Sequence, residues 1–328
     1  MTSSKYQYLT DEDVAHFLKH GFVRIPACFT KEAAADFTRD VWTRLGVDPN
    51  DVSTWNREKV NMPSHGSVKT KEFAPKAWGA MCELLGGEDR IDPESGIWND
   101  GFIVNMGKEE YRGMKVEPKK LDNWHVDGDF FVHFLDSPEQ GLLVIPLWTD
   151  IVPNGGGTMI CSDGIARIAE HLYNNPEGVL PRMQPRDQDP ENPDKPSLQW
   201  YIDTIQPCSE FHEMTGNLGD VILMHPLMLH SASKNVLRTQ RIITNPPVSL
   251  KEPFCFDRED GNYSIVEQKT IRDLGGEERA RQWKRTRERA AVIPERLKIQ
   301  NRMMEDEKRR LKEKEMGGLA ARKAQVVV

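Results

Sequence analysis

The chain has 328 residues, 38% of them hydrophobic and 29% charged, and its formal net charge is −7. This length allows one large domain or two small ones, and the composition excludes collagen-like and low-complexity proteins. No apolar run approaches the roughly 20 residues that span a bilayer, and the first ten residues lack the apolar stretch of a secretory signal. The five cysteines form no CxxC pair, which disfavours a disulfide framework or a zinc–thiolate site. We therefore expect a soluble cytoplasmic protein with no membrane partner.

Charge is distributed unevenly along the chain. Residues 271–328 contain 17 Lys and Arg against 10 Asp and Glu, a net charge of +7, which leaves −14 for residues 1–270. An acidic body disfavours broad contact with nucleic acid or another phosphate-rich partner. The basic tail can bind an anionic surface or fold back on the acidic body, and we favour the second alternative.

The first part of the chain has helical patterns. Thr10 and Asp13 have the spacing of a capping box, which predicts a helix that ends near Gly21. After it we expect a strand over 22–26 and two more helices, over 31–45 and 73–85. A glycine follows each of these two helices, where it can end the helix.

From about residue 98 the helical period gives way to short apolar or alternating runs separated by turn residues. Many short strands of this kind are typical of a sandwich or a jelly roll. Helices first and strands later predict an α+β, mainly β, fold with the helices packed on one face of the β core. The expected strands are 101–105, 130–135, 142–148, 158–161, 200–205, 221–224, 228–231 and 241–248.

Two later segments differ from the rest. Residues 181–197 carry five prolines and almost no apolar side chains, so this long connection is either a lid or binding loop, or disordered. Residues 277–315 are helix-forming and highly charged, with an interruption at Pro294. Only one of the two heptad seam positions is apolar there, so a coiled coil is poorly supported. Self-association through this helix is allowed, and the oligomeric state stays open.

The most informative segment is 123–128, with the sequence NWHVDG. His125 and Asp127 are two residues apart, so on an extended strand both side chains point to the same face. Such a pair forms two corners of a metal site, although an HxD pair also occurs often by chance. Residues 219–231 (GDVILMHPLMLHS) predict a turn, a buried strand and a second strand near His230. Two histidines and one carboxylate are the facial triad of non-haem Fe(II) oxygenases.

Arg241 follows His230 by eleven residues and begins an apolar run. An inward-pointing arginine at this place supplies a fixed, two-pronged donor for a carboxylate. Because an arginine buried in an apolar strand needs an anion, a dicarboxylate co-substrate would serve as its partner. Arg238 is the alternative, but it precedes the apolar run and is expected in a turn.

The order of these motifs resembles the phytanoyl-CoA dioxygenase family of Fe(II)/2-oxoglutarate-dependent oxygenases. The segments LTDE at 9–12, GFVRIP at 21–26, and WTD at 148–150 with NGGGTM at 154–159 also resemble that family's opening elements and central hairpin. The resemblance covers about residues 9–250. It implies a double-stranded β-helix (jelly-roll or cupin-like) core over about 98–250, in an oxygenase domain of residues 1–270. Residues 271–328 would then be a basic, helical C-terminal extension.

The resemblance also implies roles for particular residues. His125, Asp127 and His230 would hold Fe(II), Arg241 would bind the distal carboxylate of 2-oxoglutarate, and Asn105 would be a second contact to that co-substrate. With O₂, such an enzyme hydroxylates or desaturates a small organic metabolite and releases succinate and CO₂. Asp127 as a ligand leaves no place for chloride, which disfavours a halogenase. Since an acidic body suits the phosphates of CoA poorly, we expect a CoA-free substrate.

Other hypotheses stay open at this point. The chain could be a non-catalytic double-stranded β-helix that binds a partner through its basic tail, although the intact triad argues against that. It could also be a hydrolase that uses the same three ligands for zinc, which gives Arg241 no role. Among the other polar residues, we expect His133 to be structural, His225 to lie where a turn begins, and Asn235 to support its loop.

Overall fold

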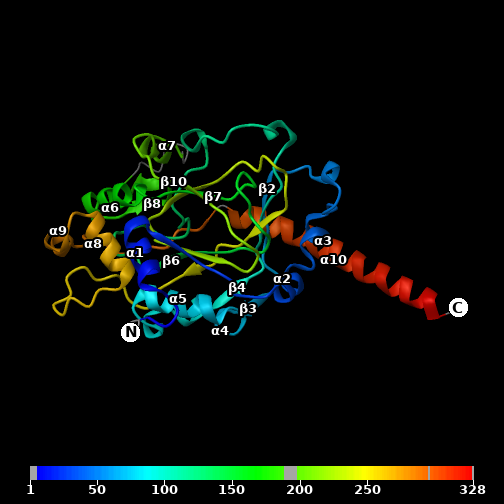
Figure 1. Cartoon of the computed structure of the whole chain (residues 1–328), viewed down its shortest axis with the longest axis horizontal. Coiled ribbons are helices and arrows are strands. Elements are labelled where there is room, and N and C mark those ends of the chain that lie inside the picture. Colours follow the sequence, from blue (N-terminus) through cyan, green and yellow to red (C-terminus); the bar gives the residue numbers. More distant parts are fainter. Residues whose placement is uncertain (1–5, 188–197, 295, 327–328) are drawn as a thin grey trace.

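The computed structural model describes residues 6–187, 198–294 and 296–326. Its strands form antiparallel sheets in the middle of the molecule, and helices lie around them (Figure 1). One end of the molecule carries α6 (Gly164–Asn174), α8 (Ile265–Asp273) and α9 (Glu277–Gln282), and the other carries α2 (Lys31–Thr38) and α3 (Val41–Leu45). The fold is therefore mixed α+β.

The first helix, α1 (Asp11–His20), confirms the predicted capping box. The hydroxyl of Thr10 accepts the backbone N–H of Asp13 at 3.0 Å, and the carboxylate of Asp13 accepts the backbone N–H of Thr10 at 2.9 Å. Gly21 ends the helix with a φ of 75°, a left-handed conformation that a residue without Cβ adopts at no steric cost. The predicted strand follows directly as β1 (Phe22–Ile25).

The helix predicted over 31–45 is in fact two helices, α2 and α3. The helical ladder stops at Arg39, whose N–H reaches back only three residues to the carbonyl of Asp36, and α3 starts afresh after Asp40. The prediction over 73–85 is confirmed as α5 (Pro75–Leu85), which follows the short α4 (Thr70–Phe73). Pro75 opens α5 because the first helical position needs no N–H.

Three sheets position the site. Their strand orders are β1-β11-β6-β14, β10-β7-β12 and β13-β5-β2, and all neighbours are antiparallel. The bounds are β2 (Lys59–Asn61), β5 (Ile103–Asn105), β6 (Leu142–Pro146), β7 (Thr158–Cys161), β10 (Phe211–Met214), β11 (Val221–Met224), β12 (Leu229–Ala232), β13 (Arg241–Ile243) and β14 (Pro247–Val248). Two small ribbons add β3 (Ser67–Lys69) with β4 (Ile97–Asn99), and β8 (Val179–Leu180) with β9 (Gln184–Pro185).

The central strands are covered on both faces. Every residue of β6, β7 and β11 is buried, and apart from Thr158 of β7 these residues are all apolar, in place of an alternating pattern. The predictions over 158–161 and 221–224 match β7 and β11 residue for residue, because a short run of β-branched and apolar residues between turn residues is a strong strand signal.

Two predicted strands are wrong. Residues 130–135 form no strand but make isolated bridges from Phe131 and His133 to distant segments. Residues 200–205 are helical, in α7 (Gln199–Ile205), which buries Tyr201 and Ile205 one turn apart. A short apolar run does not distinguish a strand from a buried helix face by its periodicity alone. The predicted strand over 241–248 is split into β13 and β14, with Pro246 between them.

The proline-rich segment is only partly described. Pro181–Met183 form a tight turn in which Arg182 and Met183 have positive φ values of 67° and 56°, and β9 follows. Residues 188–197 lie outside the described residues, so the choice between a lid and a disordered loop stays a prediction.

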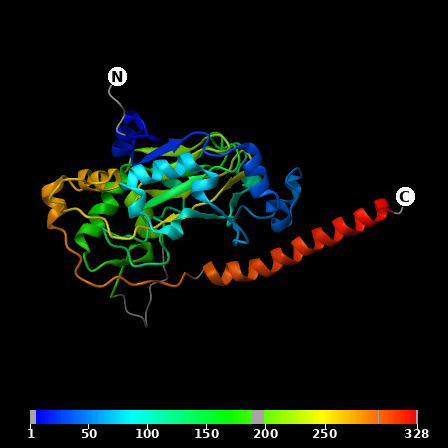
Figure 2. The same cartoon turned by 90° about the horizontal axis from the view of Figure 1, so that it is seen from below.

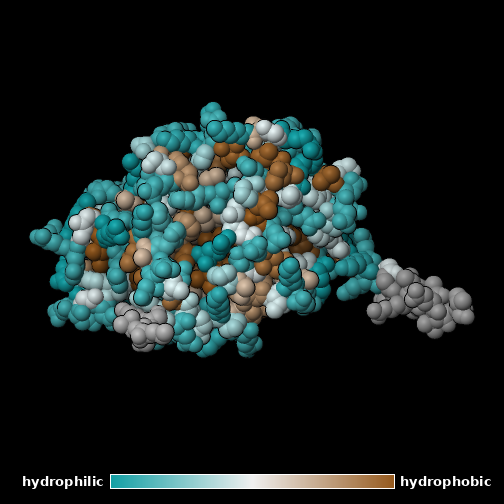
Figure 3. All heavy atoms as spheres, viewed as in Figure 1, coloured by the Kyte–Doolittle hydropathy of each residue, from teal (hydrophilic) through white to brown (hydrophobic). Residues whose placement is uncertain are grey.

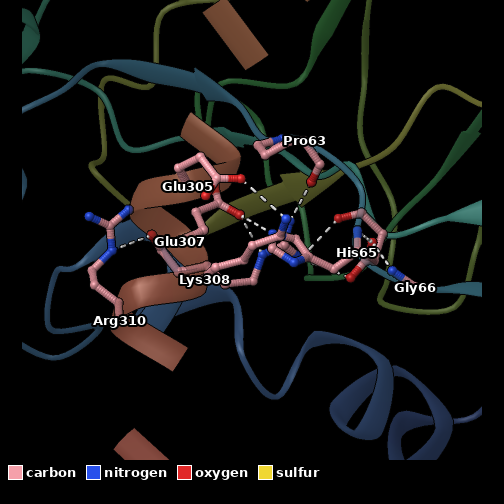
Figure 4. A network of polar contacts seen from close by, with 9 residues as sticks. Pro63, His65, Gly66, Glu305, Glu307, Lys308 and Arg310 are labelled. Carbon is pink, nitrogen blue, oxygen red and sulfur yellow. Dashed lines mark hydrogen bonds and ion pairs between the residues drawn. The ribbon is translucent and has the colours of Figure 1, made fainter. Parts of the chain in front are cut away.

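The long helix α10 (Arg296–Val326) packs against α3 with its first half, and its second half extends away from the body (Figure 2). Figure 4 shows the contact that anchors it, around Glu307, a carboxylate only 1% exposed. The guanidinium of Arg44 on α3 donates to Glu307 at 2.8 Å and to Asp100 at 2.9 Å, and His65 lies 2.9 Å from the same Glu307 oxygen. The first half of α10 is therefore folded against the acidic body, as expected for the basic extension, whereas its second half is not.

The face seen in Figure 3 is mostly hydrophilic, with hydrophobic side chains gathered in its middle. Among the described residues, none of the helices has the length and apolar character that crossing a membrane would require.

Candidate active site

The structure brings His125, Asp127 and His230 together. One carboxylate oxygen of Asp127 lies 3.4 Å from Nε2 of His125 and 3.5 Å from Nε2 of His230. All three donor atoms lie within 4.8 Å of one another. Ligands about 2.1 Å from a metal at adjacent octahedral corners are about 3.0 Å apart, so the two distances to Asp127 need to shorten by only about half an ångström for the side chains to enclose one ion.

Backbone carbonyls orient both imidazoles. Nδ1 of His125 lies 2.7 Å from the carbonyl oxygen of Asn123, and Nδ1 of His230 lies 3.0 Å from that of Met228. A carbonyl only accepts hydrogen bonds, so each Nδ1 carries a proton and each Nε2 is the nitrogen that faces the shared point. In the neutral ring that Nε2 presents its lone pair there. This tautomer is the one that a metal ligand requires.

The electrostatics of the site favour a carboxylate and a positive partner. Burial alone would raise the pKa of Asp127, but the charge of His230 and hydrogen bonds from both imidazoles hold that pKa well below its usual range. Burial lowers the pKa of His230, and its attraction to Asp127 outweighs burial and raises the pKa. Asn245 also donates to the second oxygen of Asp127 at 3.3 Å. A metal cation would meet an ionised carboxylate here.

Arg241 is a buried cation whose donors are mostly unused. Its side chain is 2% exposed, and its NH2 donates to the hydroxyl of Thr158 at 2.9 Å. Its Nε and NH1 are buried without a hydrogen-bond partner in the described part of the chain. Burial lowers the pKa of Arg241 to about 10, which measures how poorly the charge is compensated. A buried guanidinium with two idle donors fits a carboxylate ligand.

The strand pairing in one sheet places Arg241 at the cavity that His125, Asp127 and His230 line. Arg241 on β13 pairs with Asn105 on β5, which pairs with Lys59 on β2, so the three lie in one row. Arg241, Lys59, Thr158, His125, Asp127 and His230 all line one cavity of about 790 Å³. That volume falls within the range of pockets for small ligands.

The predicted role of Asn105 has no support in these contacts. Its amide donates to the carbonyls of Gly156 and Ser233, its side-chain oxygen accepts the N–H of Gly107, and it is absent from the lining of the cavity. All of its polar atoms are thus engaged in holding loops. Asn235 also supports its loop, since its amide donates to Thr239 and its oxygen accepts the N–H of that residue.

Two other histidines near the motifs are structural, as their bonds show. Nε2 of His133 lies 2.7 Å from the carbonyl of Gly128, and burial lowers the pKa of His133 to about 4. Nε2 of His225 lies 2.9 Å from the hydroxyl of Thr270, and burial lowers its pKa to about 3. Arg238 forms an ion pair with Glu109, outside the cavity.

Sequence analysis missed several residues that line the cavity. Arg296 and Gln300 reach it from the start of α10, and Arg296 is bound to Asp129 at 2.6 Å. Lys59, Arg182 and Tyr201 also belong to its polar wall. The sequence shows only that Asp129 and Arg296 have opposite charges. Nothing in the spacing of two residues 167 positions apart shows that they meet.

Comparisons with known proteins give partial likenesses. No protein-family model matches the chain. Two curated relatives are the large ribosomal subunit protein uL1 of Nocardioides sp. (35% identical over 99 residues) and of Rhodococcus erythropolis (37% over 79). These matches cover 26% and 22% of this chain. The chain spans 41% and 33% of the length of those relatives.

Solved structures align over more of the chain. HygX from Streptomyces hygroscopicus, with nickel, 2-oxoglutarate and hygromycin B bound, is 14% identical over 74% of this chain and 88% of its own, with a TM-score of 0.41. EctD from S. alaskensis, with 2-oxoglutarate and 5-hydroxyectoine, is 14% identical over 77% and 83%, with a TM-score of 0.41. The epimerase SnoN, in complex with Fe³⁺, alpha ketoglutarate and nogalamycin RO, is 14% identical over 87% and 96%, with a TM-score of 0.37. At these values the function rests on the side chains of the site and not on the alignments.

Proposed function

We propose that this protein is an Fe(II)- and 2-oxoglutarate-dependent oxygenase with a double-stranded β-helix core. The observation that carries the proposal is a single one: a two-histidine, one-carboxylate cluster shares a cavity with a buried arginine whose Nε and NH1 have no hydrogen-bond partner among the described residues. The cluster fits a metal that keeps three coordination positions for other ligands. The arginine fits the far carboxylate of a dicarboxylate co-substrate.

The three ligands match iron by their chemistry. Imidazole and carboxylate donors suit Fe(II), and both imidazoles are held in the tautomer that leaves Nε2 free. Arg241 and Thr158 would bind the distal carboxylate of 2-oxoglutarate, since Thr158 already accepts from NH2 of Arg241 and its hydroxyl proton stays available. Asn245 would hold Asp127 in its ligating orientation.

The reaction follows from the bound groups. Iron with 2-oxoglutarate and O₂ would supply the oxidising power. The co-substrate would be converted to succinate and CO₂, and the substrate would be hydroxylated at a C–H bond or desaturated by loss of two hydrogens. Asp127 occupies the corner that a halide would need, so chlorination is disfavoured. The residues of this chain orient the co-substrate, limit access of water and fix the substrate near the open positions.

The cavity favours a small polar metabolite as the substrate. Its wall carries side chains of both charge signs and several amides and hydroxyls, among them Asn61, Ser64 and Gln140. Residues 1–270 carry a net charge of −14, which disfavours the polyphosphate of a CoA thioester. We propose hydroxylation or desaturation of a CoA-free compound in the cytoplasm, by a domain of residues 1–270 to which α10 adds two cavity residues.

The test is turnover. Full-length protein loaded with Fe(II) under anaerobic conditions is mixed with 2-oxoglutarate, O₂ and a panel of polar metabolites, and succinate is measured. We expect succinate release that needs iron and rises with at least one member of the panel. A zinc-loaded enzyme that hydrolyses ester or amide substrates, with no succinate from the iron form, would support the zinc hydrolase hypothesis instead. No binding of metal at all would support the non-catalytic alternative.

A further inference from the structure

A second group of imidazoles lies outside the catalytic cavity, where the free edges of two sheets meet. His16 and His20 are one turn apart on α1, so both project from the same face of that helix. Glu210 and His212 are two residues apart at the start of β10, so both point to the same side of the extended chain. β1, which directly follows α1, and β10 are end strands of their sheets.

The donor atoms of this group are already close. Nδ1 of His20 lies 3.4 Å from a carboxylate oxygen of Glu210, and the donors of His20, Glu210 and His212 all lie within 4.8 Å of one another. Tetrahedral ligands about 2.05 Å from zinc are about 3.3 Å apart, so the first pair is in place and the third donor needs a shift of about 1.5 Å at most. A small rotation about side-chain bonds supplies that shift.

Two nitrogens of this group, Nδ1 of His20 and Nε2 of His212, are buried and lack a hydrogen-bond partner among the described residues. An unpaired buried polar atom is rare and needs an explanation, and a missing ion is one. The ring of His16, an exposed side chain, lies 4.8 Å from that of His20, centre to centre, so a fourth imidazole is next to His20 although its nitrogens lie outside the three-residue group.

The donor types of His20, Glu210 and His212 suit zinc. The charged groups that face the imidazoles are those of Asp13, Lys19, Glu210 and Asp163. A neutral imidazole has a free lone pair, and zinc binds nitrogen and carboxylate oxygen in this combination.

We propose that His20, Glu210 and His212, with His16 as the fourth ligand, form a second metal site that binds Zn²⁺. The site is separate from the proposed catalytic centre. His212 and His230 both pair with Ile160 across β7, so two strand spacings, about 10 Å, separate their backbones. None of the four residues lines the catalytic cavity. With four protein ligands it is a closed, structural site, which ties the end of α1 and the start of β1 to β10.

The experiment uses the full chain in a His125→Ala/His230→Ala background, which removes two of the three donors of the catalytic cluster. Zn²⁺ binding is measured by calorimetry, and Co²⁺ replaces Zn²⁺ for visible spectroscopy. We expect one equivalent of Zn²⁺ and the strong visible absorption of tetrahedral Co²⁺. His16→Ala, His20→Ala and His212→Ala should each weaken Zn²⁺ binding by at least about tenfold, the lower limit even for a group that only supports a ligand.

The matched control is His171→Ala, since His171 is a partly buried histidine on α6 that belongs to neither cluster. It should leave the affinity for Zn²⁺ unchanged. Circular dichroism in the presence of a chelator checks that each variant is folded, and a variant that fails this check is replaced by Glu210→Gln, which alters an exposed side chain. The proposal is overturned if the background protein binds no Zn²⁺, or if the ligand variants bind it as tightly as the background does.

Discussion

The main chains of His125 and His230 exchange two hydrogen bonds, each with an N···O distance of 2.9 Å. This pairing places a residue from an otherwise irregular segment directly beside β12. The side chains of a directly opposed antiparallel pair lie on one face of the sheet, and the two imidazole rings here are 4.3 Å apart, centre to centre. The backbone therefore sets the distance between the two rings before any metal is bound.

His125→Ala should weaken binding of Fe(II) at the proposed catalytic cluster. The fold should be retained, because Nδ1 of His125 bonds only to the nearby carbonyl of Asn123. We expect the affinity for Fe(II) to fall by at least about tenfold, because removing a ligand should cost more affinity than removing a residue that only supports a ligand. Anaerobic titration with Fe(II) measures this, and His171→Ala serves as the control. Equal affinities of the wild type and His125→Ala would contradict the assignment of this ligand.

Arg241→Met should have two effects of opposite sign. Without co-substrate, the variant should be more stable than the wild type by about 1 kcal/mol or more, because an apolar group replaces a buried, poorly compensated charge. The affinity for 2-oxoglutarate should fall by about 3 kcal/mol, roughly 100-fold, because a buried carboxylate loses its cation. Thermal unfolding with and without 2-oxoglutarate measures both effects.

Arg238→Met is the matched control for that substitution. Arg238 lies three residues before Arg241, and its guanidinium is bound to Glu109 and to the carbonyl of Val52, outside the cavity. Its loss should leave the 2-oxoglutarate-dependent shift in melting temperature intact. If Arg238→Met loses that shift and Arg241→Met keeps it, the assignment of the co-substrate arginine is wrong.

Glu307→Gln should loosen the start of α10. The substitution keeps the shape of the side chain but removes the charge that faces Arg44 and His65. Charge-assisted hydrogen bonds of this kind contribute about 2 kcal/mol, so amide exchange over the first half of α10 should become roughly 30-fold faster. Glu313→Gln, an exposed site on the same helix, should leave exchange unchanged. Equal exchange rates in the two variants would show that Glu307 does not anchor the helix.

Glu267 should make folding sensitive to acid. Burial alone would raise its pKa, but Arg90 and the N–H groups of Cys255 and Ser264 outweigh burial and lower the pKa from 4.5 to about 2. A carboxyl group whose pKa is lowered by folding stabilises the fold at pH values above its pKa in the unfolded chain, which is 4.5. This contribution is lost as the pH falls toward the pKa in the folded protein, about 2.

Between pH 5 and pH 3 this group should account for about 2 kcal/mol of the loss in unfolding free energy. Glu267→Gln should remove that part of the pH dependence, which denaturant titrations at the two pH values measure. Glu170→Gln, at an exposed ion pair with Arg279, is the control and should keep the pH dependence of the wild type. A Glu267→Gln variant that loses as much stability as the wild type over this range would contradict the linkage.

Part of the candidate site could be predicted from sequence because its constraints are local. The two-residue spacing of His125 and Asp127 predicts a shared face of an extended chain, and both side chains lie close to His230 in the structure. Spacing alone does not link this pair to His230 or to Arg241, and the resemblance of the motif order to a known family made those links. Arg241 lies on β13, in a different sheet from β12.

Contacts between distant segments could not be predicted in this way. Asn105 lies in the same sheet row as Arg241, yet its amide is used up by carbonyls from two loops that no spacing rule places there. Arg296 enters the cavity from a helix that composition alone marks as a separate extension. Residues 200–205 form a helix that buries Tyr201 and Ile205. The apolar run itself is compatible with either a strand or a buried helix face.

The most direct test of the account is the visible absorption of the anaerobic protein with Fe(II) and 2-oxoglutarate. Chelation of 2-oxoglutarate to iron in a facial triad gives a charge-transfer band, and we expect this band in the wild type and in Arg238→Met. We expect it to be absent in His230→Ala and to need a much higher concentration of 2-oxoglutarate in Arg241→Met. A wild-type protein that binds Fe(II) but shows no band at any concentration of 2-oxoglutarate would contradict the central claim.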